Sequence, residues 1–307
     1  MDIFLPVAGV TINLFLLVGA GGMVGFLSGL LGVGGGFLLT PILMMIGVPP
    51  TVAAASDTNA IVATSSSGMA AHFRLGNVDL KLGSVLLLGG LTGAAIGVQV
   101  IRVLRALGNA DFVITVTYIV VLGSLGTYML IESWQGLRRG AMASTAPSGR
   151  RRGGAGLFGR LPLQMQFPRS GVQHSIFLPF VLCAMVGVLA AIMGVGGGFI
   201  MVPMMVYLLR MPMHVAIGTD LFQILFTCAG LTIMQAATNH TVDVVLALII
   251  AAGSTIGAQI GARVGRLLRG DQLKIVLAII VLIVMAKMTI GVIMTPDSLL
   301  SYAAKGH

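Results

Sequence analysis

Residues 32–41 read Gly-Val-Gly-Gly-Gly-Phe-Leu-Leu-Thr-Pro, and residues 194–203 read Gly-Val-Gly-Gly-Gly-Phe-Ile-Met-Val-Pro. Each stretch ends one strongly apolar run and begins another, and a lone aspartate, Asp57 or Asp220, lies inside the apolar run that comes next. Three consecutive glycines break a helix because glycine loses more backbone freedom on folding than any other residue. A helix break that occurs twice between apolar segments therefore decides the architecture of this chain.

The composition is that of a membrane protein. Of the 307 residues, 57% are hydrophobic and 9% are charged, whereas soluble domains carry about 25% charged residues. A water-soluble core cannot hide so much apolar surface, because the ratio of surface to volume falls too slowly with size. We therefore predict an all-α integral membrane protein, since helices satisfy their own backbone hydrogen bonds in lipid. The first apolar run has no basic segment before it and is expected to be a retained span.

Helix-length apolar runs form two groups of five. They fall at residues 8–31, 36–47, 51–72, 80–103 and 110–131, and again at 175–193, 198–209, 213–236, 242–266 and 272–294. The second run of each group is too short to cross a bilayer core of ~30 Å at ~1.5 Å per residue. We expect these two runs to be either half-helices or spans that neighbouring turns complete.

The two groups are an internal repeat. Aligning Gly32 with Gly194 superimposes the two glycine motifs, and a single insertion in the second copy then aligns Asp57 with Asp220. A second insertion aligns Asp79 with Asp243. Because each repeat has an odd number of segments, the second copy should be inverted across the membrane, with interrupted helices at the glycine motifs. The predicted regions are a first membrane repeat at 1–131, a basic linker at 132–174 and a second membrane repeat at 175–307.

The net charge of +9 is concentrated in the linker. Residues 132–175 hold seven arginines and one acid, which leaves 11 bases against 8 acids elsewhere. A cytoplasmic loop facing anionic lipid explains this excess better than nucleic-acid binding does. Inverted repeats then place the cluster from Arg263 to Lys274 in the cytoplasm too, and only Arg102 and Arg105 lie on the unexpected side. We predict a multi-pass inner-membrane protein that contacts membrane lipid and no nucleic acid; its oligomeric state cannot be predicted.

Each glycine motif has two explanations. The helix after the break starts with free backbone N–H groups at the positive end of its dipole, which can bind an anion without a cationic side chain. Inverted-repeat transporters place such interrupted helices at the substrate site. Alternatively, the glycines only let helices pack closely. Because the motif recurs at equivalent positions, we favour an anion site. Its predicted residues are Gly34, Gly35, Gly36, Phe37, Gly196, Gly197, Gly198 and Phe199.

In the third segment of each half, polar residues lie on the same helix face as the aspartate. A carboxylate within a membrane helix costs roughly 3 kcal/mol or more and is usually functional. This predicts ion coupling, by protons or sodium, through Asp57 and Asp220. The alternative is that each aspartate caps the N-terminus of its helix, and the two roles are compatible. The polar neighbours that we expect to contact the substrate are Ser56, Asn59, Thr219 and Gln223.

The reactive side chains give little basis for an enzyme. The five histidines are scattered near segment ends without metal-ligand spacing, and the chain has no nucleophile elbow. Neither glycine motif continues as a Walker A or dinucleotide-binding loop. Cys228, alone in an apolar run, is more typical of an inert thiol than of a nucleophile. We therefore predict no catalytic residue, no metal site and no cofactor.

The motif Gly-Val-Gly-Gly-Gly-Phe with a proline four residues later, then Ala-x-Ser/Thr-Asp, occurs in both halves. It resembles the TauE/SafE sulfite exporter family of membrane transporters, related to toluene sulfonate uptake permeases, over nearly the whole chain except the linker. The resemblance implies transport of small anions such as sulfite, organosulfonates or other organic acids. Two departures are the long arginine-rich linker and the sequence Ala-Ala-Ser-Asp in the first copy, which lacks a counterpart of Gly218. The second departure leaves open whether Asp57 and Asp220 have equal roles.

The sequence thus predicts a secondary transporter, in the exporting direction, of sulfite or an organosulfonate, which works by alternating access. A passive anion channel, or a transporter of another organic acid, would use the same site. A membrane enzyme would need clustered reactive side chains, and a sensor or scaffold would act through the linker. The inverted arrangement also predicts that the two glycine motifs lie close together although they belong to different halves of the chain.

Overall fold

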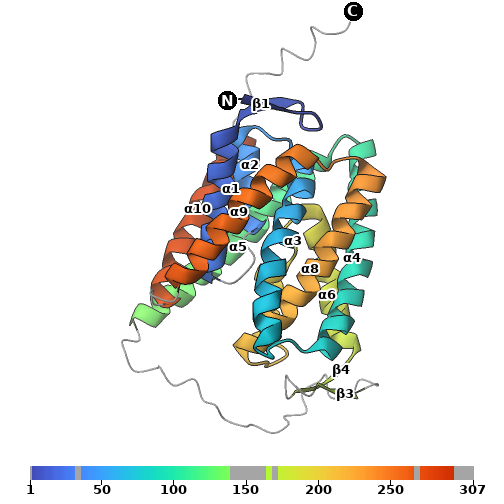
Figure 1. The fold of residues 1–307 in the computed structure, drawn as a ribbon, viewed down its shortest axis with the longest axis vertical. Helices are drawn as coiled ribbons and strands as arrows, with labels where there is room; N and C mark the ends of the chain where they lie inside the picture. The colour runs from blue at the N-terminus through green and yellow to red at the C-terminus, as the bar shows by residue number, and fades with distance from the viewer. Residues whose placement is uncertain (1, 32–35, 139–163, 168–171, 266–269, 294–307) are drawn as a thin grey trace, which may run out of the picture.

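The computed structural model describes residues 2–31, 36–138, 164–167, 172–265 and 270–293. Within these ranges the chain forms ten α-helices and two short β-hairpins, which confirms an all-helical membrane architecture (Figure 1). The first half contains α1 (Leu14–Leu31), α2 (Gly36–Ile46), α3 (Pro50–Arg74), α4 (Leu80–Ala106) and α5 (Ala110–Arg138). The second half contains α6 (Phe177–Met193), α7 (Gly198–Tyr207), α8 (Met213–Asn239), α9 (Val244–Gly265) and α10 (Gly270–Ile293).

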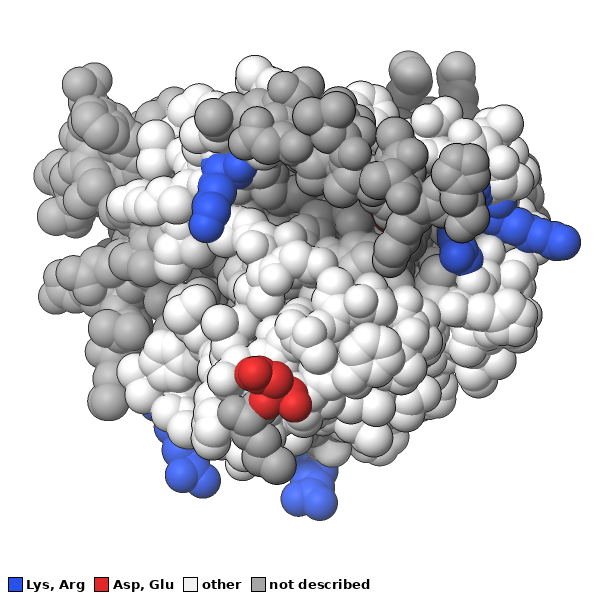
Figure 2. All heavy atoms as spheres, turned by 90° about the horizontal axis from the view of Figure 1, so that it is seen from above, with Lys and Arg blue, Asp and Glu red and all other residues white. Residues whose placement is uncertain are grey.

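The helices carry their apolar side chains outward as well as inward. Among the described residues, four helical stretches are long and apolar enough to cross a membrane, in α4, α5, α8 and α9. Phe15, Ile233 and Leu248 are 74%, 68% and 67% exposed. Among the described residues on the end of the molecule that Figure 2 views, charged side chains form small separate groups. Because soluble proteins rarely expose so many large apolar side chains along several helices, the solvent around these helices is lipid.

Each half begins with a β-hairpin that the sequence patterns did not predict. β1 (Asp2–Leu5) pairs with β2 (Val10–Asn13), and β3 (Gln164–Phe167) pairs with β4 (Val172–Ser175). Asp2 and Gln164, which begin the two hairpins, are equivalent in the alignment that superimposes the glycine motifs. β3 and most of β4 lie within residues 132–174, the range expected for the linker. The two hairpins lie at opposite ends of the molecule (Figure 1).

Helix pairing follows the repeat. α1 packs on α9, and its counterpart α6 packs on α4; α3 packs on its own counterpart α8, and α5 packs on α10. Thr58 of α3 contacts Thr232 of α8, while Gly68 of α3 lies against Leu221. Between these two contacts the residue number rises along α3 and falls along α8. The two helices therefore run antiparallel. Equivalent helices of the two halves are therefore oppositely directed where they meet.

Close backbone contact holds two of these pairs together. A side chain at Gly257 of α9 would overlap with the carbonyl oxygen of Gly22 in α1, and one at Gly93 of α4 would overlap with the carbonyl oxygen of Ala184 in α6. Small residues allow such approach in membrane proteins, where packing and not the hydrophobic effect drives helix association. The close-packing explanation thus applies to these glycines, which lie outside the two glycine motifs.

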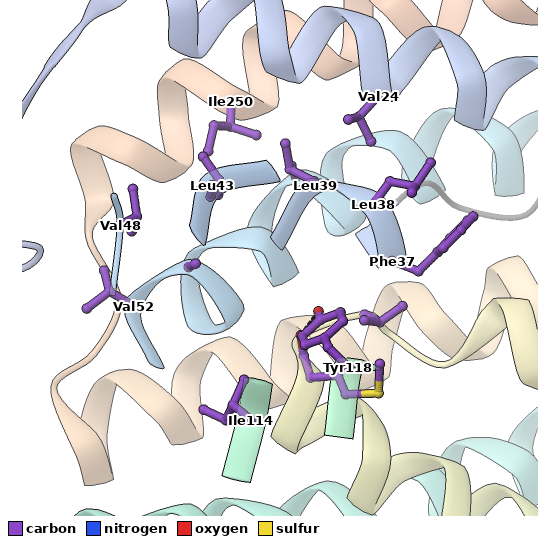
Figure 3. Packing of buried hydrophobic residues seen from close by; sticks show 14 of the residues in the cluster. Val24, Phe37, Leu38, Leu39, Leu43, Val48, Val52, Ile114, Tyr118 and Ile250 are labelled. Carbon is purple, nitrogen blue, oxygen red and sulfur yellow. Dashed lines mark hydrogen bonds between the residues drawn. The ribbon is translucent and has the colours of Figure 1, made fainter. Parts of the chain in front are cut away.

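The helices that follow the glycine motifs are half-helices. α2 has 11 residues and α7 has 10, which at ~1.5 Å per residue is about half of a bilayer core. α2 runs back along the first half of α3, because Thr40 bonds to Asp57 and Gly36 contacts Ile61. Figure 3 shows Leu43 of α2 beside Ile250 of α9. The start of α2 therefore lies level with the middle of α3.

Candidate functional site

The two glycine motifs meet where the halves of the molecule contact each other. Phe37 and Phe199, equivalent residues of the repeat, stack with ring centroids 5.4 Å apart and an interplanar angle of 30°. Ile61 of α3 touches both motifs, because a side chain at Gly36 would overlap with it and one at Gly196 would lie 3.2 Å from its Cγ2. The predicted proximity of the motifs is confirmed for these residues. Gly34 and Gly35 lie outside the described residues.

The second break has a backbone that only glycine adopts readily. Gly194 ends α6 with φ at +73°, and Gly197 precedes α7 with φ at +84°. At both positions an L side chain would be strained. A side chain at Gly194 would also overlap with the carbonyl oxygen of Ala54 in α3. The loop between α6 and α7 is therefore fixed against the other half of the molecule.

This loop offers backbone donors at the start of α7. The N–H groups of Ile200 and Met201 donate to the carbonyl of Gly197. Within the described part of the chain, no acceptor is recorded for the N–H groups of the preceding predicted site residues, Gly196, Gly197, Gly198 and Phe199. Free N–H groups at the positive end of a helix dipole are suited to an anion.

The two aspartates are buried inside helices. Asp57 is 0% exposed and Asp220 is 2% exposed. Oδ2 of Asp57 accepts a hydrogen bond from the Thr40 hydroxyl at 2.8 Å, whereas Oδ1 of each aspartate has no partner among the described residues. α3 begins at Pro50 and α8 at Met213, so both aspartates lie about two turns inside. The alternative that they cap their helices is wrong.

A different pair of equivalent aspartates caps the N-termini of α4 and α9. Oδ1 of Asp79 accepts from the N–H of Leu82 at 3.2 Å, and Oδ1 of Asp243 accepts from the N–H of Leu246 at 3.1 Å. These contacts satisfy backbone donors in the first turns of α4 and α9. All four aspartates are buried, and the sequence pattern alone did not show which pair caps helices and which pair lies inside them.

Ser56 and Thr219 connect the two halves reciprocally. The N–H of Asp243 donates to the Ser56 hydroxyl at 3.1 Å, and the N–H of Asp79 donates to the Thr219 hydroxyl at 3.0 Å. Each hydroxyl precedes a buried aspartate and holds the start of a helix from the opposite half. This positioning role is distinct from substrate contact, which stays a prediction for both residues.

The remaining predicted polar residues make contacts within their own helices. Asn59 donates from Nδ2 to the carbonyl of Ser56 at 3.5 Å. Gln223, 2% exposed, donates from Nε2 to the Thr227 hydroxyl at 2.9 Å. Asn59 is only half-buried. Gln223 therefore lies in the protein interior beside Asp220, whereas Asn59 lies nearer the surface of α3.

A small cavity lies beside Asp57. Residues of α1, α2, α3 and α9 line it, and among the described residues its polar lining consists of Ser28, Asp57, Thr64 and Ser254. Sequence reasoning missed Ser28, Ser254 and the Asp57 partner Thr40, because a single hydroxyl in an apolar run usually bonds its own helix. It also missed Tyr118 of α5, whose hydroxyl donates to the carbonyl of Met193 just before the second glycine motif.

Apolar helices of membrane-spanning length, in a duplicated arrangement where Phe37 and Phe199 meet near buried carboxylates, define a multi-pass membrane protein. The chain belongs to the TauE/SafE sulfite exporter family, because the family profile described as "Sulfite exporter TauE/SafE" matches residues 17–288. The resemblance of the motifs is thereby confirmed. Membership makes this chain a membrane transporter and not an enzyme.

Individual relatives agree with the family. A "Probable membrane transporter protein" of Xylella fastidiosa is 28% identical over 251 residues, which cover 81% of this chain and 84% of the relative. The "Probable membrane transporter protein YunE" of Bacillus subtilis is 23% identical over 277 residues, 88% of this chain and 94% of the relative. The "Sulfite exporter TauE/SafE family protein 3" of Arabidopsis thaliana is 36% identical over 92 residues, 29% of this chain and 19% of the relative. No solved structure matches this chain.

Proposed function

We propose that this chain is a secondary transporter that exports a small sulfur-containing anion, sulfite or an organosulfonate, by alternating access. The observation that carries the proposal is the convergence of the two glycine motifs at the Phe37–Phe199 stack. The family description and the name of the Arabidopsis relative support sulfite as the substrate class. Two helix breaks that meet between two halves provide one binding position that either side of the membrane can reach in turn.

The proposed membrane arrangement is a pair of inverted repeats in the inner membrane. The antiparallel contact between α3 and α8 supports inversion, as do the hairpins at opposite ends of the molecule (Figure 1). The half-length of α2 and α7 would bring both breaks near the bilayer midplane. In this arrangement the repeats occupy residues 1–131 and 175–307, and the arginine-rich linker 132–174 lies in the cytoplasm.

The proposed anion contacts are backbone N–H groups and not basic side chains. Arg263 and Lys287 are exposed on their helices, and Arg105 donates to the carbonyl of Asn239 at the end of α8. The oxygens of a sulfite or sulfonate group can instead accept from the free N–H groups at the start of α7. An uncharged donor set holds the anion without the tight binding that a buried arginine would give, which favours release.

The polar residues on α3 and α8 complete the proposed site. Asn59 and Gln223 would contact the substrate along its path, next to the hydroxyls of Ser56 and Thr219. An isolated buried carboxylate is costly, so a buried aspartate should bind a cation or a proton. That positive charge would also offset the charge of the anion. Asp57 and Asp220 are the proposed coupling residues.

Binding and counterflow measurements test this function. The purified protein is melted with sulfite, thiosulfate, organosulfonates and carboxylates; a ligand at 100 times its Kd stabilises the folded state by ~2.7 kcal/mol. The stabilising anion is then followed in proteoliposomes preloaded with unlabelled anion. A transporter accelerates entry of labelled anion by exchange, whereas a passive channel shows no such acceleration. Absence of both stabilisation and flux with every sulfur-containing anion would overturn the proposal.

A further inference from the structure

We infer that the cavity beside Asp57 binds a sodium ion, and that the side-chain amide of Gln223 takes the corresponding place near Asp220. The role of this ion in driving transport rests on the proposed function, but its binding does not. Sodium would then be the coupling ion. Of the two buried aspartates, Asp57 would bind the ion and Asp220 would not.

Among the described residues, the polar side chains that line the cavity offer oxygen atoms and no N–H donor. Oδ1 of Asp57 has no partner among the described residues. The hydroxyl of Thr64 donates to the carbonyl of Ala60 at 3.0 Å, and that of Ser254 donates to the carbonyl of Ala251 at 3.3 Å. Because their hydrogens are used, both hydroxyls have only lone pairs left for the cavity. Carboxylate and hydroxyl oxygens are ligands for hard cations, not for anions.

The internal repeat provides a built-in comparison. Thr40, which donates to Asp57, corresponds to Val202 in the alignment of the two glycine motifs. Two cavity residues differ in the same way. Ser28 corresponds to Ala190, and Ser254 corresponds to Gly90 in the alignment that pairs Asp79 with Asp243. The surroundings of Asp57 therefore carry hydroxyls at three positions where the surroundings of Asp220 carry none.

The space equivalent to the cavity is filled by a tethered amide. Ala60, which lines the cavity, corresponds to Gln223 in the alignment that pairs Asp57 with Asp220. A side chain at Gly90, the counterpart of Ser254, would lie 2.7 Å from Nε2 of Gln223. The amide of Gln223 thus occupies the place next to Gly90 that corresponds to the space beside Ser254. Its Nε2 donates to the Thr227 hydroxyl at 2.9 Å, so this place holds an N–H donor where the described polar side chains of the cavity beside Asp57 offer only oxygen atoms.

Sodium fits the cavity better than a proton or a divalent ion does. A proton needs only the carboxylate, so it gives no reason for the additional hydroxyls around Asp57. Magnesium keeps several waters and calcium takes six to eight oxygen ligands, whereas this cavity has room for roughly one water molecule. Asp57 contributes a single negative charge, which one monovalent ion neutralises without a charge left buried.

Melting the purified full chain without any anion substrate tests the inference. Sodium chloride replaces choline chloride at constant ionic strength, with potassium chloride as a second control. We expect the melting temperature of the wild type to rise with sodium and to saturate. Asp57→Asn and Ala60→Gln should lose the sodium response, the second because it places the amide found beside Asp220 in the cavity. Ser254→Ala should raise the half-saturating sodium concentration at least threefold, and Asp220→Asn should keep the response.

Each outcome decides the inference. A wild type that sodium stabilises no more than choline or potassium would overturn it, as would a sodium response that survives in Ala60→Gln. The wild type could instead be stabilised by lower pH and not by sodium, with Asp57→Asn abolishing the effect of pH. That result would assign the cavity to a proton and reject sodium. If Asp57→Asn does not fold, Ala60→Gln and Ser254→Ala still decide. Failure here leaves anion transport standing, because no anion is used and anion counterflow is measured separately.

Discussion

Thr40 and Asp57 show how much one buried contact decides at the centre of this protein. Asp57 is fully buried, and its one recorded side-chain hydrogen bond among the described residues comes from Thr40. A buried charge is tolerated only when it is paired or hydrogen-bonded. Thr40 is therefore a positioning residue for Asp57, and the valine at the equivalent position 202 leaves Asp220 to a different environment.

Replacing this threonine tests the contact directly. Thr40→Val keeps the side-chain volume but removes the donor to Asp57, so we expect a loss of ~1–3 kcal/mol in stability, measured by thermal melting. Thr117→Val is the matched control, because the Thr117 hydroxyl donates only to the carbonyl of Val113 in its own helix. An equal loss of stability in the two variants would show that the Thr40–Asp57 contact stabilises the protein no more than a hydrogen bond within one helix does.

At the residue scale, the sequence predicted the burial of Asp57 and Asp220 better than it predicted which residues contact each other. The equivalence and burial of Asp57 and Asp220 followed from the repeat and from the cost of a charge in lipid. The contacts of Ser56 and Thr219 with the opposite half could not be foreseen, because they join residues 187 and 140 positions apart. Nor could the sequence tell that Ser28 and Ser254 meet at one cavity.

At the scale of helices, the reciprocal hydroxyl contacts link the two halves. Ser56→Ala and Thr219→Val each leave a backbone N–H without its acceptor at the start of α9 or α4. We expect each to lower the free energy of unfolding by ~1–3 kcal/mol, with similar values because the contacts are equivalent. Ser66→Ala, whose exposed hydroxyl bonds its own helix, should stay within ~0.5 kcal/mol of the wild type. Melting temperatures measure all three; a large loss in Ser66→Ala would argue against the specific role.

The glycine contact between α1 and α9 makes a second prediction at this scale. A methyl group at Gly257 would overlap with the backbone of Gly22, so Gly257→Ala should separate the helices and lower the melting temperature or the yield of folded protein. Gly19 of α1 has open space where its side chain would be. Gly19→Ala should therefore be neutral or stabilise by up to ~1 kcal/mol, because alanine favours helix. Indistinguishable melting of the two variants would contradict the packing described.

Most helix positions were predictable from the apolar runs. The run expected at 80–103 became α4 (Leu80–Ala106), and the run at 213–236 became α8 (Met213–Asn239). The run expected at 8–31 instead contains β2 before α1. Strands of 4 residues are too short for a period of two to show against an apolar background.

At the scale of the whole molecule, the inverted arrangement fixes the sides of the termini. If the repeats are inverted and the linker is cytoplasmic, a reporter fused after residue 307 should lie on the opposite side of the membrane from one inserted at residue 150. Reporter pairs that are active only in the cytoplasm or only outside it give the answer. A C-terminal reporter on the same side as the linker reporter would contradict the inversion.

The proposed anion site lies where the two glycine motifs converge. The most direct measurement is counterflow of labelled sulfite in proteoliposomes that contain equal amounts of folded wild type, Gly197→Ala or Gly291→Ala. Gly197 has φ at +84° and lies against Val186, whereas Gly291 of α10 has open space around it. We predict at least tenfold slower counterflow for Gly197→Ala and a wild-type rate for Gly291→Ala. Wild-type counterflow in Gly197→Ala would contradict the account.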